Sequence, residues 1–588
     1  MSHATPGIEA HFQYGKRLHG AGRLNEAAQI YQQILAAMPE HAEAMDALGA
    51  LLLQAGEAAQ GLAWIERAIG LKGRAPVFHT HRAHALLVLR RPVEAAEAAR
   101  AALRLKRGHA EAYQALGHAL SDSGDWDGAL QAYREAARLK PDLPDALNNL
   151  GAALHHRHRL DEAARALNRA LVHDPNDPGA LINLSGVLKE LGRFEEAGAR
   201  LDAALKRAPG DVRALYDRAL LWLLQGRLAE AWPGWEERFR AGAVPDRALT
   251  TPGVPSKPRW PNKPRWRGEP LAGRTLLVHA EQGLGDTIQF CRYLSSPGAP
   301  LGGRAPLDGP RAPLGGPGAP LDGIAASLNG TVILEAQPRI ARLLGTLAGP
   351  RRIVAAGEPL PDHDLTCPLM SLPAIHATTL STIPAPIPYL SAGPERVARW
   401  RARIGEHGFR VGVAWQGNPD RREDHGRSLT PDHFMPLAAL PGVRLISLQK
   451  DTGALASGPL ASGSPIERPG MKNVGIERPG TERPGIESLG IESLGEDFDS
   501  GPDGFLDTAA AMMSLDLVIS SDTVIPHLAG ALGRPVWLAL RKVPDWRWLT
   551  EGAACPWYPT MRLFRQDTRD DWTPVFAAMR ARLAARDV

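Results

Sequence analysis

Residues able to do chemistry gather at the ends of predicted strands in the second half of this 588-residue chain. The first group is Gly283-Leu284-Gly285-Asp286, between the apolar run LLVHA and the helical stretch TIQFCRYL. Because glycine lets a ligand approach the main chain and a helix N-terminus attracts anions, this turn predicts a binding loop. Asp286 is then a candidate general base for an attacking hydroxyl. The alternative is that Asp286 only caps the following helix, where Asp is a preferred residue.

A second group, SSDTVIPHLAGALG, lies between another apolar run and a helix. It places Ser521, Asp522 and Thr523 at the turn and His527 in the first turns of the helix. That helix would direct its N-terminus and the His527 ring at an anionic group. The alternative for His527 is a helix residue whose polar atoms are satisfied by packing.

A third group follows the apolar run RVGVAW. Gln416 and Asn418 form a polar turn there, which we expect to line a cleft. Arg427 comes shortly after, and its guanidinium can hold two phosphate oxygens at once.

The elements that must position these groups are alternating strands and helices. The expected strands are LLVHA, TVILEA, RRIVAA, RVGVAW, RLISLQ, LDLVIS and RPVWLAL. This alternation predicts two α/β units, 271–400 and 401–588, which face each other across a cleft. Ligands bind at the carboxyl ends of strands in such units, which is where all three groups fall.

The first part of the chain is repetitive. Small residues recur every 34 residues from about residue 8 to 245, which is the period of a tetratricopeptide helix pair, and seven units fit one frame. The first small position of each unit is Gly15, Gly49, Ala83, Gly117, Gly151, Ser185 and Ala219. An α-solenoid of this kind presents a concave face, so a protein or peptide partner is expected on it.

Residues 246–270 are expected to link the two parts, and Trp232, Trp235 and Phe239 to form a hydrophobic seam between them. Residues 297–323 repeat APLGG or APLDG, and residues 466–495 run in pentads such as IERPG and IESLG. Neither stretch has the apolar content or length to build a core. The sequence therefore predicts disordered surface inserts at 297–323 and over much of 452–500.

Composition excludes several functional classes. The net charge is +4, and no basic run interleaved with aromatic residues accompanies it, so nucleic acid is not an expected partner. The three cysteines are far apart and match neither a disulfide framework nor a metal site. No apolar stretch is long enough to cross a bilayer, and a cytoplasmic location is expected.

Two of these groups resemble a known family. GLGDTIQF and SDTVIPHLAGALGRPVW look like segments of bacterial tetratricopeptide proteins that carry a glycosyltransferase domain. That domain is similar to the lipopolysaccharide heptosyltransferases of family 9 and, more distantly, to O-linked N-acetylglucosaminyl transferases. The resemblance covers nearly all of residues 271–588 apart from the inserts. It implies a GT-B fold, a nucleotide-sugar donor bound mainly by the second unit, inversion at the anomeric carbon, and no required metal or other cofactor.

The resemblance also implies residue roles. Asp286 matches the proposed base of the heptosyltransferases, and Arg427 lies where the family places a basic residue on the diphosphate. Asp522, Thr523 and His527 match its D-T-x-x-x-H donor-phosphate motif. Apart from the resemblance, Gly283, Gly285 and Ser521 are expected to bind the donor or its phosphates because they lie in the two turns at strand ends. Pro526 departs from a plain helix start, because it removes a donor in the first turn.

In the O-linked N-acetylglucosaminyl transferases an asparagine ladder on the inner face of the repeats grips the acceptor backbone. The matching positions here are Gln13, Ala47, His81, Ala115, Asn149, Asn183 and Asp217. Only two of these are asparagine, so the expected partner is not bound by a full ladder of this kind.

The leading hypothesis is an inverting, metal-independent glycosyltransferase that transfers a sugar from a nucleotide-sugar donor to an acceptor, such as a protein, recruited by the repeats. A different class is a tetratricopeptide scaffold whose sugar-transfer fold is degenerate and only binds. A third is a heptosyltransferase that acts on a lipid-linked saccharide, which would not need the repeats.

Overall fold

The computed structural model describes most of the chain in two compact units. The described residues are 5–141, 144–241, 263–295, 330–350, 352–384, 387–417, 426–450, 486–501 and 504–587. The first unit ends at Pro209 and the second begins at Gly210.

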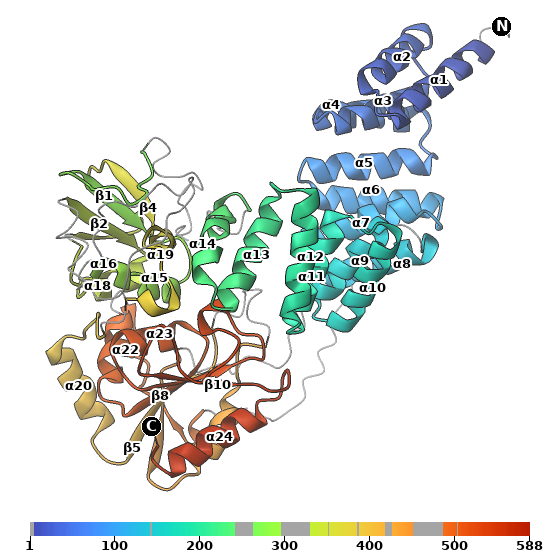
Figure 1. Cartoon of the computed structure of the whole chain (residues 1–588). Helices are drawn as coiled ribbons and strands as arrows, with labels where there is room; N and C mark the ends of the chain where they lie inside the picture. The colour runs from blue at the N-terminus through green and yellow to red at the C-terminus, as the bar shows by residue number, and fades with distance from the viewer. Residues whose placement is uncertain are drawn as a thin grey trace. The chain divides into compact units, whose positions relative to one another are not determined.

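The first unit consists of antiparallel helix pairs, each packed on the next (Figure 1). Its helices are α1 (Thr5–Gly20), α2 (Leu24–Ala37), α3 (Ala42–Gln54), α4 (Ala58–Leu71), α5 (Pro76–Val88), α6 (Pro92–Leu105), α7 (Ala110–Asp122), α8 (Trp126–Leu139), α9 (Pro144–His156), α10 (Leu160–His173), α11 (Pro178–Glu190) and α12 (Phe194–Arg207). The predicted solenoid is thus present, in the predicted frame.

The small positions explain how closely the helices of a pair approach. A Cβ atom placed at Gly117 would lie 2.5 Å from the Tyr133 ring, and one at Gly151 would lie 2.5 Å from Leu167. At the turn inside each pair the backbone is left-handed, as at Gly124, whose φ is 84°. In the third and fifth pairs Arg90 and His158 adopt this conformation instead, with φ values of 58° and 54°, although side chains disfavour it.

The seventh helix pair belongs to the second unit. It comprises α13 (Val212–Leu224) and α14 (Leu228–Trp235), followed by a 3-10 turn, Glu236–Phe239. Trp232 and Trp235 are buried, and their indole N–H groups donate to the carbonyl oxygens of Thr378 and Met370 at 2.7 and 2.9 Å. The predicted seam therefore exists at the two tryptophans, whereas Phe239, its third predicted member, is 37% exposed. The boundary between the two units therefore lies after residue 209 and not after residue 245 as predicted, because the seventh helix pair packs on the part of the chain that follows it.

The second unit contains a four-stranded parallel sheet with the order β3-β2-β1-β4. Its strands are β1 (Thr275–His279), β2 (Thr331–Ala336), β3 (Arg352–Ala355) and β4 (Leu365–Pro368). Trp266, predicted to lie in the linker, is buried, and its backbone N–H donates to Thr366 of β4. The described end of the predicted linker is therefore part of this fold. Residues 297–323 lie outside the described residues.

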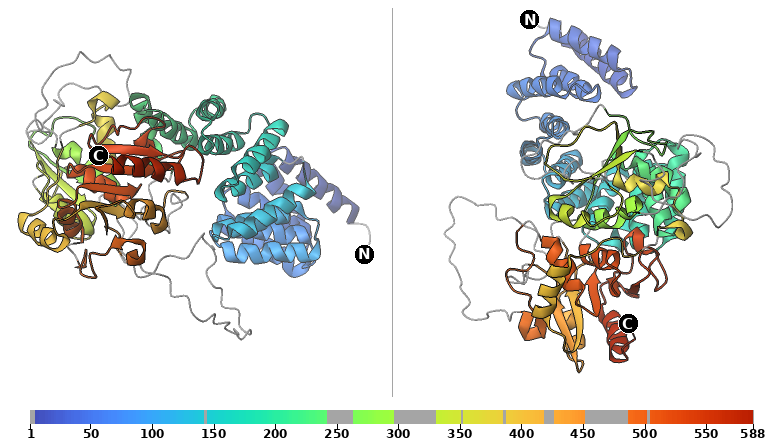
Figure 2. Two further views of the ribbon diagram at one scale, coloured as in Figure 1. Left: turned by 90° about the horizontal axis from the view of Figure 1, so that it is seen from below. Right: turned by 90° about the vertical axis from the view of Figure 1, so that its left-hand side faces the viewer.

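A six-stranded parallel sheet follows, with the order β10-β9-β8-β5-β6-β7. Its strands are β5 (Phe409–Ala414), β6 (Val443–Ser447), β7 (Ile491–Glu492), β8 (Leu517–Ser521), β9 (Val536–Leu540) and β10 (Met561–Arg565). The right-hand view of Figure 2 shows most of this sheet in orange and red. Seven strands of the unit match the predicted ones, whereas β4, β7 and β10 were not predicted.

The prediction of an insert is wrong for residues 486–500. Ile486 and Ile491 are buried in the core of the six-stranded sheet, and Ile491 pairs with Leu445 of β6. The two IESLG pentads carry Ser-Leu where IERPG carries Arg-Pro, so no proline prevents them from extending a sheet edge. Residues 452–485 lie outside the described residues.

Helices cover both sheets and complete an α/β architecture. The short helices after β1 and β2 are α15 (Leu284–Phe290), α16 (Arg292–Ser295) and α18 (Pro338–Leu344), and α19 (Leu372–Ile375) follows β4. The six-stranded sheet carries α20 (Pro394–Ile404), α21 (Met435–Ala438), α22 (Gly504–Met512), α23 (Val524–Ala531) and α24 (Thr573–Ala584). One face of that sheet packs Val413 and Trp537 against Phe434, Phe576 and Met579, which come from the region of α21 and α24.

Candidate ligand-binding cleft

The loop after β1 is held in place by hydrogen bonds at both ends. Gly283 is the N-cap of α15, and Asp286 Oδ2 accepts a hydrogen bond from its backbone N–H at 2.7 Å. Gln337, before α18, donates to the Gln282 carbonyl at 2.8 Å and accepts from the Thr287 hydroxyl at 2.9 Å. Asp286 therefore does cap the helix, as the alternative interpretation predicted. Its other oxygen, Oδ1, remains directed elsewhere.

The turn after β8 places its polar residues in two environments. Thr523 is the N-cap of α23, and its hydroxyl accepts from Ile525 N–H at 3.2 Å. Ser521 is fully buried and donates to the Trp415 carbonyl at 2.9 Å, so it braces β8 rather than lining a cavity. Pro526 is the third residue of the helix, where the N–H has no intrahelical partner in any case. It does not delay the start of the helix.

His527 is buried between the two sheets. Its Nδ1 lies 3.1 Å from the Tyr558 hydroxyl, and a Cβ atom at Gly285 would lie 2.8 Å from its ring. Gly285 is thus needed for the approach of this ring. Burial, reinforced by the Arg547 guanidinium, lowers the pKa of His527 to about 3, so the ring is neutral at pH 7. It contributes a hydrogen-bonding group and no positive charge.

The carboxyl ends of strands from both sheets border one cleft of about 730 Å³. Of the predicted site residues, those that line it are Gly283, Gly285, Asp286, Gln416, Arg427, Asp522, Thr523 and His527. Ser521 is not among the lining residues, and Asn418 lies outside the described residues. Parallel strands bring their ends to one edge within each sheet, and the two sheets turn these edges toward the same cleft.

The cleft also holds charged residues that the sequence interpretation missed. They are Arg339, Lys450, Asp499, Asp545 and Arg547. Arg547 lies in the 3-10 turn Trp546–Trp548, and its Nη2 donates to Asp286 Oδ1 at 2.5 Å. Its Nη1 donates to Asp545 at 2.7 Å. Asp545 follows the end of β9, so extending the strand-end rule to RPVWLAL would have found this group.

Asp522 and Asp545 are two buried carboxyls of the cleft whose pKa values shift in opposite directions. Burial raises the pKa of Asp522, and the nearby Asp545 carboxylate raises it further. Burial opposes ionisation of Asp545 too, but the Arg547 guanidinium keeps the pKa of Asp545 below its ordinary value. The pKa of Asp522 rises only to about 6, so both carboxyls are largely ionised at pH 7.

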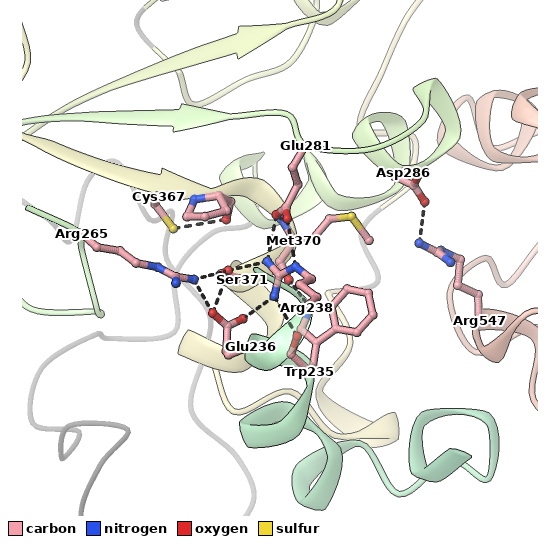
Figure 3. A network of polar contacts seen from close by, with 11 residues as sticks. Trp235, Glu236, Arg238, Arg265, Glu281, Asp286, Cys367, Met370, Ser371 and Arg547 are labelled. Carbon is pink, nitrogen blue, oxygen red and sulfur yellow. Dashed lines mark hydrogen bonds and ion pairs between the residues drawn. The ribbon is translucent and has the colours of Figure 1, made fainter. Parts of the chain in front are cut away.

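Behind the cleft, the seventh helix pair is tied to the loop after β1 (Figure 3). Arg238 is fully buried and holds both oxygens of Glu281 at 2.9 Å through Nε and Nη2. It also donates to Glu236 at 2.8 Å and to the Ser371 hydroxyl at 2.7 Å. Glu281 in turn accepts from the Met370 N–H at 3.0 Å. The cleft loop thus begins at a residue fixed by the last repeat.

The ladder positions of the repeats make contacts within the array. Asn183 donates to Asn148 of the preceding pair at 2.8 Å, and Asn149 lies 3.2 Å from His118 Nε2. His81 Nδ1 lies 2.9 Å from the Asp46 carboxylate. These side chains form hydrogen bonds between neighbouring repeats, whereas the asparagine ladder described above binds a ligand backbone.

Comparison with known proteins supports the repeats. A family model described as tetratricopeptide repeat matches residues 18–83 and 154–219, and one described as TPR repeat matches residues 117–157. Protein FlbA of Caulobacter vibrioides (strain ATCC 19089 / CIP 103742 / CB 15) is 27% identical over 392 residues, which is 63% of this chain and 54% of FlbA. The chain thus spans about half the length of this curated relative.

Solved structures resemble parts of the chain. YrrB, a TPR protein with an unusual peptide-binding site, is 23% identical, with 33% of this chain and 100% of YrrB covered and a TM-score of 0.28. The Cut9–Hcn1 hetero-tetramer of the APC/C is 18% identical, with 37% and 44% covered and a TM-score of 0.35. Among the described residues, no helix has the length and apolar character to span a membrane. The N-terminal helix pairs are tetratricopeptide repeats, a scaffold suited to protein interaction.

Proposed function

We propose that the chain is an inverting glycosyltransferase that uses a nucleotide-sugar donor and needs no metal, and that its second unit is of the GT-B type. The observation that carries this proposal is the composition of the cleft. Asp286, at the end of a strand of one sheet, faces Arg427, Thr523 and His527, at the ends of strands of the other. Inverting transfer requires a base at the acceptor hydroxyl and stabilisation of the departing diphosphate, and the two walls carry suitable groups.

The roles follow from the charges. Asp286 takes the proton of the acceptor hydroxyl. Arg427 and the neighbouring cations of the cleft stabilise the diphosphate, because a guanidinium keeps its charge at any relevant pH. His527 is neutral at pH 7, so it contributes a hydrogen bond from Nε2 when the Tyr558 hydroxyl donates to Nδ1. The polar turn at Gln416 lies on the same wall.

The repeats supply the acceptor in this proposal. Tetratricopeptide arrays present a concave surface to proteins and peptides, and the last pair of this array is fixed to the loop that carries Asp286 through Arg238 and Glu281. An acceptor protein held on the array would therefore be tied to the unit that bears the cleft.

A second candidate is a tetratricopeptide scaffold whose α/β part binds without catalysis. It is favoured by the two contacts of Asp286, which accepts hydrogen bonds from Gly283 N–H and from Arg547. Both are contacts that a purely structural carboxylate would also make.

A nucleotide screen with a transfer assay separates the two candidates. A nucleoside diphosphate that binds the native protein must raise its melting temperature, and labelled nucleotide sugars then report transfer or hydrolysis. Asp286→Asn should lower turnover by about a hundredfold or more while nucleotide binding persists, because Asn cannot take a proton. Arg427→Ala should instead weaken diphosphate binding by roughly 1.5–3 kcal/mol.

Asp499→Asn is the matched control. Asp499 also lines the cleft, but its carboxylate accepts from Thr508, so turnover should fall far less than in Asp286→Asn. Full transfer activity in Asp286→Asn would refute the catalytic role. Failure of every nucleotide to stabilise the unmodified protein would favour the scaffold.

A further inference from the structure

Arg547 is an arginine of the cleft with spare hydrogen-bonding capacity. Its side chain is almost fully buried and stacks on the Trp546 ring, with 4.6 Å from the guanidinium carbon to the ring centroid. Nη1 and Nη2 donate to Asp545 and Asp286. Within the described part of the chain, Nε has no hydrogen-bond partner. A buried guanidinium N–H without a partner is costly, which indicates a group that is satisfied by a ligand.

The partner of Nη2 comes from the opposite wall. Asp286 lies on α15, after β1 of the four-stranded sheet, whereas Arg547 follows β9 of the six-stranded sheet. Their ion pair therefore spans the cleft, as Figure 3 shows for the two side chains. Asp286 keeps a second anchor, the hydrogen bond from Gly283 N–H to its Oδ2. It can release Arg547 without losing its place in the loop.

We propose that Arg547 is an anion-binding residue of the cleft and that Asp286 is its internal competitor, occupying the guanidinium until the diphosphate of a ligand displaces it. A carboxylate and a phosphate present similar pairs of oxygens to an arginine, so one can replace the other. A diphosphate offers more oxygens and more charge than one carboxylate. Asp286 and Asp545 leave the buried Nε without a partner, so the guanidinium is not saturated in the present arrangement.

The surroundings favour a diphosphate as the displacing group. Arg339, Arg427 and Lys450 line the same cleft, together with the carboxylates of Asp499, Asp522 and Asp545, so an anion in the cleft has cations besides Arg547 to contact. Asp545 stays on Nη1 and fixes the guanidinium, because it also accepts from the Arg547 backbone N–H at 3.0 Å.

The displacement has a consequence for catalysis, which rests on the proposed function. While Asp286 Oδ1 accepts from Arg547, one of its two lone pairs is occupied and cannot accept from an acceptor hydroxyl. Binding of the donor diphosphate frees it. Arg547 would thus keep the base occupied until the donor is in place.

Inorganic pyrophosphate is the probe that tests the competitor, because it carries the diphosphate without sugar or base. Its affinity is measured by titration calorimetry on the full chain at low ionic strength. Asp286→Asn should tighten binding by about fivefold or more, since it removes the competing charge and keeps the cap on α15. Asp499→Asn removes one negative charge from the same cleft without contacting Arg547, and should tighten binding by no more than about twofold.

Arg547→Lys is the second variant, because lysine keeps the positive charge but lacks the paired N–H donors of the guanidinium. It should weaken pyrophosphate binding by about tenfold, and Asp286→Asn should add little in the double variant. Equal affinity in the unmodified chain and Asp286→Asn, or an equal gain in Asp499→Asn, would overturn the inference, as would a lack of binding in all variants. If the unmodified chain transfers sugar but Asp286→Asn does not bind pyrophosphate more tightly, only this inference is refuted. If Asp286→Asn binds pyrophosphate more tightly but the unmodified chain transfers no sugar, only the proposed function is refuted.

Discussion

Two acid–arginine pairs stand at the two ends of the short loop that follows β1, and they differ in how completely they are satisfied (Figure 3). In the first pair, the side chains of Arg238 and Glu281 are 0% and 3% exposed, and every guanidinium nitrogen of Arg238 donates a hydrogen bond. In the second, Arg547 and Asp286 are 8% and 20% exposed and face the cleft.

The difference separates a structural pair from a functional one. Arg238 shares both its forked nitrogens with both oxygens of Glu281, so no room remains for a ligand. Arg547 meets Asp286 through one nitrogen, and its Nε has no partner among the described residues. A saturated buried pair fixes the loop, whereas an unsaturated pair at a cleft can be exchanged.

The largest expected effect is loss of the buried pair. Glu281→Gln leaves the Arg238 charge buried with only part of its partners, and we expect about 3–5 kcal/mol less free energy of unfolding. Glu237→Gln is the matched control, because Glu237 lies in the same turn and pairs with the exposed Arg240, which predicts less than about 1 kcal/mol. Urea denaturation followed by tryptophan fluorescence measures both. Equal losses would show that burial does not distinguish these pairs.

Sequence patterns predicted the parts of the molecule that repeat locally. The 34-residue period located the helix pairs, and the strand-end rule selected Asp286, Asp522 and His527 as residues of the cleft, because ligands bind at the carboxyl ends of parallel strands. Among the strands that were not predicted, β7 has only two residues, which carry no periodicity.

Long-range pairs could not be predicted in the same way. Asp286 and Arg547 are 261 residues apart, and no local pattern states that the two sheets bring them together. The same holds for Arg238, which appeared in the sequence as one charge beside the Trp232 and Trp235 seam. Ser521 shows the reverse case, because a strand-end position leaves open whether a hydroxyl faces the cleft or the interior.

The next largest expected effect concerns His527, which lines the cleft. The pKa of His527 is about 3 in the folded chain and about 6.5 in the unfolded chain. Below pH 6.5 the ring is therefore protonated in the unfolded chain only, and the free energy of unfolding decreases as the pH is lowered. Between pH 6.5 and 5.5 this group alone should cost about 1 kcal/mol. In His527→Gln that share of the pH dependence should disappear, as measured by urea denaturation at both pH values. An unchanged slope would contradict a buried neutral ring.

The smallest expected effect is that of Asp286→Asn on stability. Asn keeps the shape of Asp286, and its Oδ1 can still accept from Gly283 N–H, so the cap on α15 survives. Only the ion pair with Arg547 is lost, and Arg547 keeps Asp545 and access to water in the cleft. We therefore expect a change of less than about 1 kcal/mol in the free energy of unfolding. The same denaturation measurement as for Glu281→Gln provides the direct contrast. A loss as large as that of Glu281→Gln would mean that Asp286 and Arg547 are a second structural pair, and the exchange with a diphosphate would then cost more than a ligand can supply.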